Sequence, residues 1–411
     1  MKDNEGDAAS TVAPKRYVIL DALRGLAILG ICLANYPEFS LYSFLTAEAA
    51  DTMPSAGADS MTRWGLTVFI DGKFYTIFSL LFGIGFSIIL ENVSGRGGNG
   101  LKIFYRRMFG LIVIGFFHLM FLWSGDILIL YAVVGMTLPL FIRAKDNFIL
   151  WSALFFLILP VILDTIFELA RINPSAALVG WQWEQCDKYG ITEENFAYWL
   201  RDGESYGDVF KFLIQGAIVR LQEFVDGNRY FKVLGLFLIG YYIGRNHLYK
   251  DLERNVAHLK TICKSGLLLG LPLSIIYAWS SISGHPLGNG FHSLLYFISV
   301  YLTGFGYIAG ICLLYINNKR WRIWRALSAP GRMALTNYIG QSVIGMLIFY
   351  GIGFGLGASV GLCGVEAIAL SVYVSEMIFS VIWLKLFRFG PLEWCWRCFT
   401  YGKIFQITYK K

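Results

Sequence analysis

Long apolar stretches separated by short polar segments form the main pattern along this chain. A membrane-spanning helix needs roughly 20 mainly apolar residues, and about ten stretches approach that length. They are residues 17–37, 64–90, 106–123, 126–143, 148–170, 230–245, 262–282, 291–316, 332–352 and 362–387. The pattern predicts an all-α fold, a polytopic integral membrane bundle of about ten transmembrane helices.

A polar segment at residues 171–229 divides these stretches into two groups of five. We expect a first five-helix half at 17–170, a second at 230–387, and terminal tails at 1–16 and 388–411. The dividing segment has mixed charge and apolar residues at helical spacing. It is therefore predicted to form short amphipathic helices at the outer face of the membrane.

Basic residues are unevenly distributed among the connecting segments. If residues 1–16 are cytoplasmic, every loop on that side carries Lys or Arg. The short outer loops at 38–63, 283–290 and 353–361 hold only Arg63. This alternation follows the positive-inside rule and predicts that both termini are cytoplasmic.

Composition supports the membrane interpretation and excludes others. Hydrophobic residues make up 56% of the chain and charged residues only 15%, too few to cover a soluble surface of this size. The net charge of +7 lies in short loops, so we expect a lipid bilayer and no nucleic acid as partner. Cys395 and Cys398 form a lone C-x-x-C without a second pair, and no metal is expected.

Charged residues inside apolar helices cost at least about 2.5–3.5 kcal/mol on insertion scales, so each needs a partner or a function. Asp21 and Arg24 lie three residues apart near the cytoplasmic end of the first stretch. Either they form an ion pair, or Arg24 faces an anionic ligand and Asp21 orients it. Asn35, at the outer end of this stretch, either packs there or donates to a substrate oxygen.

His118 and Asp126 flank a very tight turn between the third and fourth stretches. A helical hairpin would bring them onto the same outer face, where a carboxylate could orient the imidazole as a general base. The alternative is a hydrogen bond that locks the hairpin, with Asp126 as an N-cap.

Four further polar residues interrupt apolar stretches. Asp71 and Lys73 surround Gly72, which indicates a local break in the second stretch and leaves either a structural pair or a site. Asn337 and Gln341 lie in the ninth stretch, where amides either bond between helices or line a polar cavity.

Several motifs spread over nearly the whole chain are specific when taken together. They are Arg16-x-x-x-x-Asp21-x-Leu23-Arg24-Gly25 followed by Asn35, Gly72-Lys73-Phe74, His118 to Asp126-Ile127-Leu128, Gly331-Arg332-Met333-Ala334-Leu335-Thr336-Asn337-Tyr338 with Gln341, and Phe389-Gly390-Pro391-Leu392-Glu393-Trp394. In these motifs the chain resembles the YeiB family of bacterial membrane proteins (domain of unknown function 418). The resemblance implies a multi-pass protein of the bacterial cytoplasmic (inner) membrane.

That family is distantly similar to transmembrane acyltransferases, such as heparan-alpha-glucosaminide N-acetyltransferase. These enzymes pass an acyl group from cytoplasmic acyl-CoA to a sugar on the other side. The shared Asp-x-x-Arg-Gly opening and the asparagine that ends helix one correspond to Asp21, Arg24, Gly25 and Asn35. Heparan-alpha-glucosaminide N-acetyltransferase, a lysosomal enzyme, has a histidine in the loop after helix one. In this chain the corresponding residues 36–63 contain no histidine.

We therefore expect an acyltransferase that moves an acyl group from cytoplasmic acyl-CoA to an extracytoplasmic sugar or lipid-linked acceptor. Arg24, Arg106 and Arg107 would bind the CoA phosphates. His118, oriented by Asp126, would act as the base, and Asn35 would stabilise the oxyanion. The alternatives are a transporter or flippase that uses a polar path, and a scaffold that binds through residues 171–229.

Overall fold

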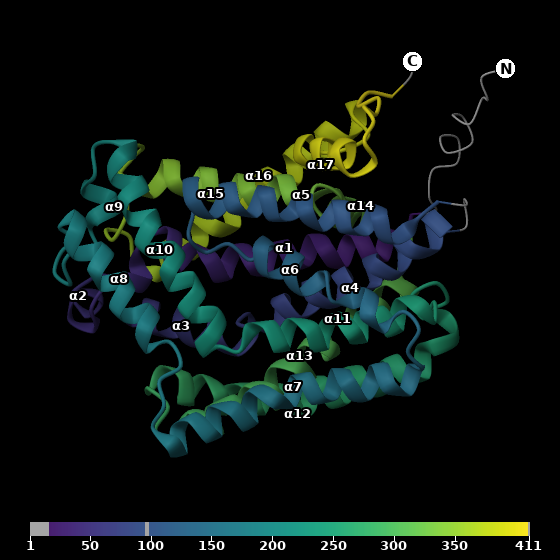
Figure 1. Ribbon diagram of the computed structural model, residues 1–411, viewed down its shortest axis with the longest axis horizontal. Helices are drawn as coiled ribbons and strands as arrows, with labels where there is room; N and C mark the ends of the chain where they lie inside the picture. Colours follow the sequence, from purple (N-terminus) through teal and green to yellow (C-terminus); the bar gives the residue numbers. More distant parts are fainter. Residues whose placement is uncertain (1–15, 95–97, 410–411) are drawn as a thin grey trace.

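The computed structural model describes residues 16–94 and 98–409, so residues 1–15 of the predicted N-terminal tail and the final residues 410–411 lie outside it. The described residues form helices, with one isolated β-bridge between Phe387 and Thr408. This confirms the all-α prediction. In Figure 1 most of the long helices run along the long axis of the molecule, and both ends of the described chain lie at the same end of the bundle.

Seven helical segments of the described chain are long and apolar enough to cross a membrane, which makes this a multi-pass membrane protein by helix length and composition. They are α1 (Val18–Phe39), α3 with α4 (Ala56–Phe69 and Lys73–Ser94), α5 (Gly100–Phe121), α7 (Asp146–Ala170), α12 (Val256–Ile282), α13 (Asn289–Asn317) and α16 (Leu362–Leu386). Each coincides with one of the apolar stretches expected from the sequence.

The remaining three expected stretches also form helices, but shorter ones. They are α6 (Leu128–Gly135) continuing into η2 (Leu138–Phe141), α11 (Arg229–Arg245) and α15 (Ala334–Phe349). An α-helix rises 1.5 Å per residue, so these helices fall short of the roughly 20 residues that a straight crossing needs. The expected count of about ten crossings therefore stays a prediction.

Further helices, most of them short, close the two ends of the bundle. At the end away from the termini lie η1 (Tyr42–Phe44), α2 (Ala47–Asp51), α8 (Ala176–Tyr189), α9 (Trp199–Asp202) and α10 (Tyr206–Asp226). At the end with the termini lie η3 (Glu253–Asn255), α14 (Arg322–Arg332) and α17 (Pro391–Tyr401). The segment 171–229 thus contributes α8, α9 and α10 (Figure 1).

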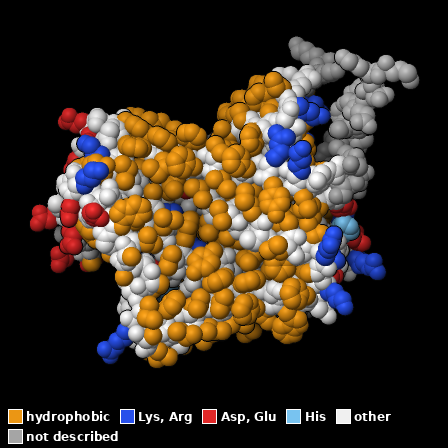
Figure 2. Space-filling view, in the orientation of Figure 1, with side chains coloured by type: hydrophobic (Ala, Val, Ile, Leu, Met, Phe, Trp, Pro, Cys, Tyr) orange, Lys and Arg blue, Asp and Glu red, His pale blue; other side chains and the backbone are white. Residues whose placement is uncertain are grey.

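The surface is divided in the way a bilayer would require. Figure 2 shows hydrophobic side chains across the middle of the molecule, with acidic side chains gathered at the end formed by α8 and α9. Large apolar side chains such as Trp151 (70% exposed) and Leu268 (72% exposed) point away from the bundle. Contiguous exposed apolar surface of this kind is covered by lipid in membrane proteins.

Two glycines permit a very close contact between α1 and α14. A Cβ at Gly25 would lie 1.9 Å from the Leu327 carbonyl oxygen, and one at Gly331 would lie 1.8 Å from the Asp21 carbonyl oxygen. Only glycine allows backbones to approach so closely. This contact fixes the start of α1, and with it Arg24, against the segment that leads into α15.

Candidate functional site

His118 and Asp126 meet across the tight turn that joins α5 to α6. His118 lies in the last turn of α5, and Asp126 precedes Leu128, the first residue of α6. His118 Nδ1 is 2.8 Å from Asp126 Oδ2, and both side chains are buried. Asp126 Oδ1 also accepts the backbone N–H of Ile129 at 2.9 Å. The geometry therefore contains both expected arrangements, an oriented imidazole and a carboxylate that caps the next helix.

A serine on α15 completes this group, and sequence reasoning did not identify it. Ser342 Oγ lies 2.8 Å from His118 Nε2, so the imidazole bridges Asp126 and Ser342. The serine and the histidine are 224 positions apart in the sequence. The only sequence signal was a serine one turn after Tyr338 in an apolar helix, and this signal names no partner.

A cavity of about 230 Å³ lies between the helices. It extends from beside this group towards the end of the bundle that holds α17 and the start of α1. Its lining comes from α1, α4, α5, α6, α14, α15 and α17. Towards the termini it is lined by Arg24, Arg107, Arg332, Glu393 and Trp396. Its apolar walls include Phe78, Leu81, Phe82, Phe86, Phe104 and Met108, and its far end is lined by Ile127, Leu128, Tyr131 and Tyr338. The cavity is thus basic at one end and apolar along its length.

Tyr338 separates the far end of the cavity from the histidine. Its ring centroid is 5.1 Å from that of His118, and its hydroxyl donates to the Gly125 carbonyl oxygen at 3.4 Å. On α5 the buried residues Phe104, Met108, Leu111, Gly115 and His118 share one face, and Phe104, Met108 and Leu111 line the cavity. The cavity therefore follows this face of α5 towards His118 and ends at the Tyr338 ring.

The three arginines at the basic end are held in different ways. Arg24 Nη1 contacts Asp21 Oδ1 at 3.0 Å and donates to the Gly331 carbonyl oxygen at 3.4 Å. The Arg107 guanidinium lies 3.8 Å from the centroid of the Trp396 ring. Arg332 Nε is buried and has no hydrogen-bond partner among the described residues. Guanidinium groups with unused donors suit phosphate or carboxylate oxygens. Arg332 was not among the expected site residues.

A carboxylate also lines this end and fixes α15. Glu393 Oε1 accepts the backbone N–H groups of Leu335 at 2.7 Å and Thr336 at 3.0 Å, and Glu393 Oε2 accepts the Thr336 hydroxyl at 2.6 Å. Its burial raises the pKa of the Glu393 carboxyl, an effect that these hydrogen bonds partly offset. Glu393 thus caps α15, the helix that carries Tyr338 and Ser342.

Arg106, expected beside Arg107 at the anion site, turns elsewhere. Its Nη2 donates to the Phe399 carbonyl oxygen of α17 at 2.7 Å, and it does not line the cavity. Successive helix residues point about 100° apart, and here this rotation turns Arg106 towards α17 while Arg107 lines the cavity. Asn35 is half-buried on α1, four residues beyond the cavity-lining residue Ile31. It lies on the same face of α1 as Ile31.

The two amides of α15 face α16 rather than the cavity. Asn337 Nδ2 donates to Ser380 Oγ at 3.0 Å, and Gln341 Nε2 donates to Glu376 Oε2 at 2.8 Å. Neither residue lines the cavity with Arg24. Of the two expected arrangements, the structure shows the interhelical hydrogen bonds.

Asp71 and Lys73 lie apart from this site, at the break between α3 and α4. Gly72 has φ +71°, which lets the chain turn between the two helices. Lys73 Nζ donates to the Thr67 carbonyl oxygen at 2.8 Å, and Asp71 Oδ2 accepts the Tyr277 hydroxyl at 2.7 Å. Each side chain thus has a partner other than the neighbouring charge, and Asp71 ties the break to α12.

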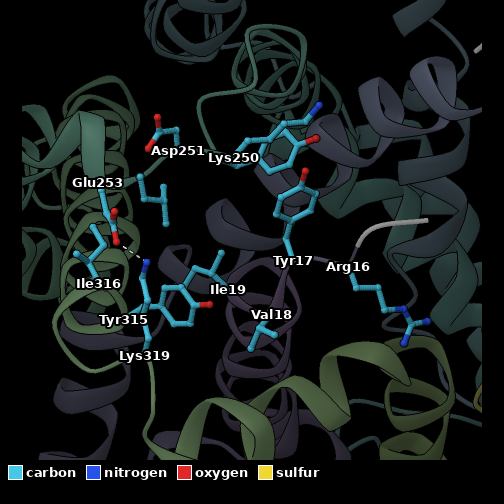
Figure 3. Close-up of a pocket in the computed structure, with 12 residues that line it drawn as sticks. Arg16, Tyr17, Val18, Ile19, Lys250, Asp251, Glu253, Tyr315, Ile316 and Lys319 are labelled. Carbon is cyan, nitrogen blue, oxygen red and sulfur yellow. Dashed lines mark hydrogen bonds and ion pairs between the residues drawn. The ribbon is translucent and has the colours of Figure 1, made fainter. Parts of the chain in front are cut away.

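A second cavity, of about 240 Å³, opens at the terminal end between the start of α1, the segment after α11 and the end of α13 (Figure 3). Its lining carries both charge signs, and Lys319 and Glu253 pair across one side of it. In Figure 3 the Arg16 side chain points away from this pair. None of the residues of the His118 group lines this cavity.

Comparison with known proteins gives matches along nearly the whole chain. Residues 243–403 match a family model described as "Protein of unknown function (DUF418)". The chain is 29% identical over 405 residues to uncharacterized protein YxaH of Bacillus subtilis (strain 168), with 95% of this chain and 96% of the relative covered. It is 30% identical over 398 residues to an uncharacterized 39.9 kDa protein in the amylase 3′ region of Bacillus acidopullulyticus, with 97% of both covered. It is 28% identical over 395 residues to uncharacterized protein YeiB of Escherichia coli (strain K12), with 94% and 96% covered.

Proposed function

We propose that this chain, which belongs to the YeiB family (DUF418) of membrane proteins, is a membrane-embedded acyltransferase. It would move an acyl group from cytoplasmic acyl-CoA to an extracytoplasmic acceptor, such as a sugar or a lipid-linked molecule. The observation that carries the proposal is the cavity with arginines at one end and the His118 group beyond the other.

The proposal includes an orientation in the bacterial cytoplasmic (inner) membrane. We place both termini and the arginine end of the cavity in the cytoplasm, with ten crossings arranged as five plus five. The basic loops at residues 143–147, 245–261 and 317–332 support this orientation, since basic residues concentrate on the cytoplasmic side. Acyl-CoA would then meet Arg24, Arg107 and Arg332 directly from solution.

The dimensions of the cavity suit the donor. Arg107 and His118 are separated by eleven residues of one helix, which corresponds to about 16 Å. An extended pantetheine arm spans a comparable distance between the CoA pyrophosphate and the thioester. Phosphates held by the arginines would therefore place the thioester near Tyr338, at the end of the cavity next to His118.

The acceptor would approach from the opposite end. There α10 covers the turn between α5 and α6: Arg220 Nε donates to the Ser124 carbonyl oxygen at 2.9 Å, and the Tyr206 hydroxyl donates to the Phe121 carbonyl oxygen at 2.6 Å. In the proposed mechanism His118 removes a proton from the acceptor, Asp126 stabilises the imidazolium, and Asn35 donates to the developing oxyanion.

A transporter or flippase is the alternative, and one observation favours it. Lys73 is fully buried and Asp71 is hydrogen-bonded to Tyr277, on the side of the bundle formed with α12. Intramembrane charges of this kind often mark substrate or proton paths. This cluster would have no part in acyl transfer, so variants of Lys73 separate the two functions.

Calorimetric binding of acetyl-CoA and longer acyl-CoAs to detergent-purified protein tests the proposal. We expect micromolar affinity that Arg24→Ala weakens by roughly tenfold, because a charge-assisted contact contributes about 1.5–3 kcal/mol. Arg254→Ala, which removes an exposed arginine outside the cavity, is the matched control. If no acyl-CoA binds, the acyltransferase proposal is wrong and transport becomes the better account.

A further inference from the structure

The buried group around His118 has the connectivity of a serine nucleophile with its base and orienting carboxylate. Asp126 Oδ2 is 2.8 Å from His118 Nδ1, and Ser342 Oγ is 2.8 Å from His118 Nε2. All three side chains are buried, with 1% of each residue exposed. This geometry alone defines the roles, since the arrangement recurs on unrelated folds.

The direction of the two hydrogen bonds follows from the surroundings of Asp126. Its Oδ1 accepts the backbone N–H of Ile129, and a carboxylate offers only acceptors, so Oδ2 is assigned as the acceptor towards His118. His118 then donates through Nδ1–H, and Nε2 presents a lone pair. Ser342 donates its hydroxyl hydrogen to Nε2, which is the orientation that activates a serine.

Ser342 differs from ordinary helix serines in where its hydroxyl points. Serines inside apolar helices usually donate back to the carbonyl four residues earlier. Ser371 and Ser375 on α16 do so, each at 2.8 Å. The corresponding distance from Ser342 Oγ to the Tyr338 carbonyl oxygen is 3.4 Å, longer than its 2.8 Å approach to His118. The hydroxyl is therefore directed at the imidazole.

Ser342 also lies where the donor would end. Tyr338 lines the far end of the cavity, and Ser342 follows four residues later on the same face of α15, about 6 Å along the helix. Movement of the Tyr338 ring would open the way from the cavity to Ser342.

We propose that Ser342 is the catalytic nucleophile and carries the acyl group as a serine ester between donor and acceptor. This inference rests on the proposed acyltransferase function. In the first half, His118 Nε2 takes the Ser342 proton, Oγ bonds to the thioester carbonyl carbon, the C–S bond breaks, and the proton passes to the thiolate, which leaves as CoA. In the second half, His118 takes the proton of the acceptor hydroxyl or amine, the acceptor bonds to the carbonyl carbon, the C–Oγ bond breaks, and Ser342 recovers a proton.

With an acyl-enzyme, acyl-CoA and the acceptor do not have to be bound at the same time. Once CoA has left, the ester at Ser342 stays inside the bundle beside the turn covered by α10. The acceptor can then enter from the opposite end while the donor cavity is empty. The mechanism therefore predicts ping-pong kinetics and exchange of label between CoA and acyl-CoA without any acceptor.

Mass spectrometry of the full-length protein after incubation with acetyl-CoA tests the proposal directly. We expect one acetyl group on Ser342, released by hydroxylamine, and none on the His118→Ala or Ser342→Ala variants. Transfer by Ser342→Ala should fall at least about a thousandfold. The matched control is Ser371→Ala, which removes an exposed helix serine and should keep wild-type labelling. Ser342→Cys, which keeps a nucleophile of similar size, should still take up the acetyl group and covers the case in which the alanine variant does not fold.

Two results overturn the proposal, and they differ in what they leave standing. If Ser342→Ala folds and transfers acetyl groups at a wild-type rate while His118→Ala does not, the transfer is direct and the acyltransferase function survives without the nucleophile. If the wild-type protein neither binds acetyl-CoA nor becomes labelled, the nucleophile and the proposed function both fall.

Discussion

Arg107 and Trp396 are joined by two contacts at the basic end of the cavity. The Trp396 indole N–H donates to the Arg107 carbonyl oxygen at 2.9 Å, and the Arg107 guanidinium lies 3.8 Å from the indole ring centroid. The pair connects α5 to α17 and stacks the charge of Arg107 against an aromatic wall of the cavity. The neighbouring Arg106 instead donates to Phe399 of the same helix. Two adjacent arginines therefore have different tasks, one towards the cavity and one towards α17.

Substitution of Arg107 and of Arg106 distinguishes binding of acetyl-CoA in the cavity from general attraction of anions to a positive surface. Arg107→Ala should raise the Kd for acetyl-CoA by about ten- to a hundredfold, because it removes a charge-assisted contact from the cavity. Arg106→Ala removes the same charge one residue away, outside the cavity lining, and should change the Kd by less than about threefold. Calorimetry at one fixed salt concentration makes the comparison. Equal losses in both variants would mean that the surface field attracts the ligand and that the cavity does not bind its phosphates.

The charge of Asp126 can be removed while its hydrogen bond to the first turn of α6 is kept. Asp126→Asn retains an oxygen for the Ile129 N–H, but its amide would donate to His118 Nδ1 and force the other tautomer. His118 could then no longer accept the Ser342 proton, and turnover should fall about a thousand- to ten-thousandfold with little change in melting temperature.

Asp126→Ala is the companion variant, since it also removes the cap of α6. It should lose the same turnover and in addition destabilise the fold by about 0.5–2 kcal/mol. Acyl-transfer assays and thermal unfolding in detergent provide the two readouts. Near wild-type turnover in Asp126→Asn would show that Asp126 only locks the hairpin.

Local relationships in the sequence predicted part of this site. Asp21 with Arg24 and His118 with Asp126 lie within one helix turn or across one tight turn, so their spacing alone brings them together. The break at Gly72 could be predicted for the same reason. The positions of the long helices could be predicted from the lengths of the apolar runs. The thickness of the bilayer sets the length that a spanning helix needs, whichever helices it packs against.

The rest depended on which helices meet, which a single sequence does not reveal. Ser342 reaches His118 across 224 positions, and Arg332 joins Arg24 and Arg107 only because α14 leads into α15 beside the cavity. Arg106 was expected near the ligand, but it is turned towards α17. For Asn337 and Gln341 the sequence left open a polar cavity or interhelical hydrogen bonds, and the rotation of α15 turns both towards α16. The chemistry of a side chain was visible in the sequence, whereas its direction was not.

Burial of Glu393 should make stability depend on pH. Its pKa is raised by burial, so the folded protein holds this proton more tightly than the unfolded chain does. The contribution to stability is therefore fully present below the unfolded pKa of about 4.3 and is lost as pH rises through the folded pKa. Glu393→Gln keeps an oxygen acceptor and does not titrate. The melting temperature of the variant relative to the wild type should rise as pH increases above the unfolded pKa of about 4.3.

Asp208 provides a control of opposite sign. Hydrogen bonds from Lys211 and Ser205 lower the pKa of this partly exposed carboxyl on α10, so its contribution is lost as pH falls. Relative to the wild type, Asp208→Asn should therefore gain stability towards acid, whereas Glu393→Gln should gain it towards neutral pH. Parallel pH profiles for the two variants would contradict the prediction for Glu393.

Gly85 offers a steric probe of the cavity itself. It lies in α4 and lines the cavity, and a Cβ built there meets no atom within 4 Å. Gly85→Ala should therefore be accepted and should stabilise the helix by up to about 1 kcal/mol. Gly85→Leu should extend a side chain into the cavity and weaken acetyl-CoA binding at least about tenfold, because the pantetheine arm would need that space.

The matched control is Gly57→Leu, the same change at an exposed helix position of α3 where a Cβ also meets no atom within 4 Å. It should leave acetyl-CoA binding unchanged, and thermal unfolding should show both leucine variants to be folded. Calorimetry of acetyl-CoA binding then distinguishes the two cases. A ligand that shares the cavity with a leucine side chain loses contact area, and its affinity falls. Wild-type affinity in Gly85→Leu would place the acyl-CoA somewhere other than this cavity, and the route from the arginines to His118 would have to be abandoned.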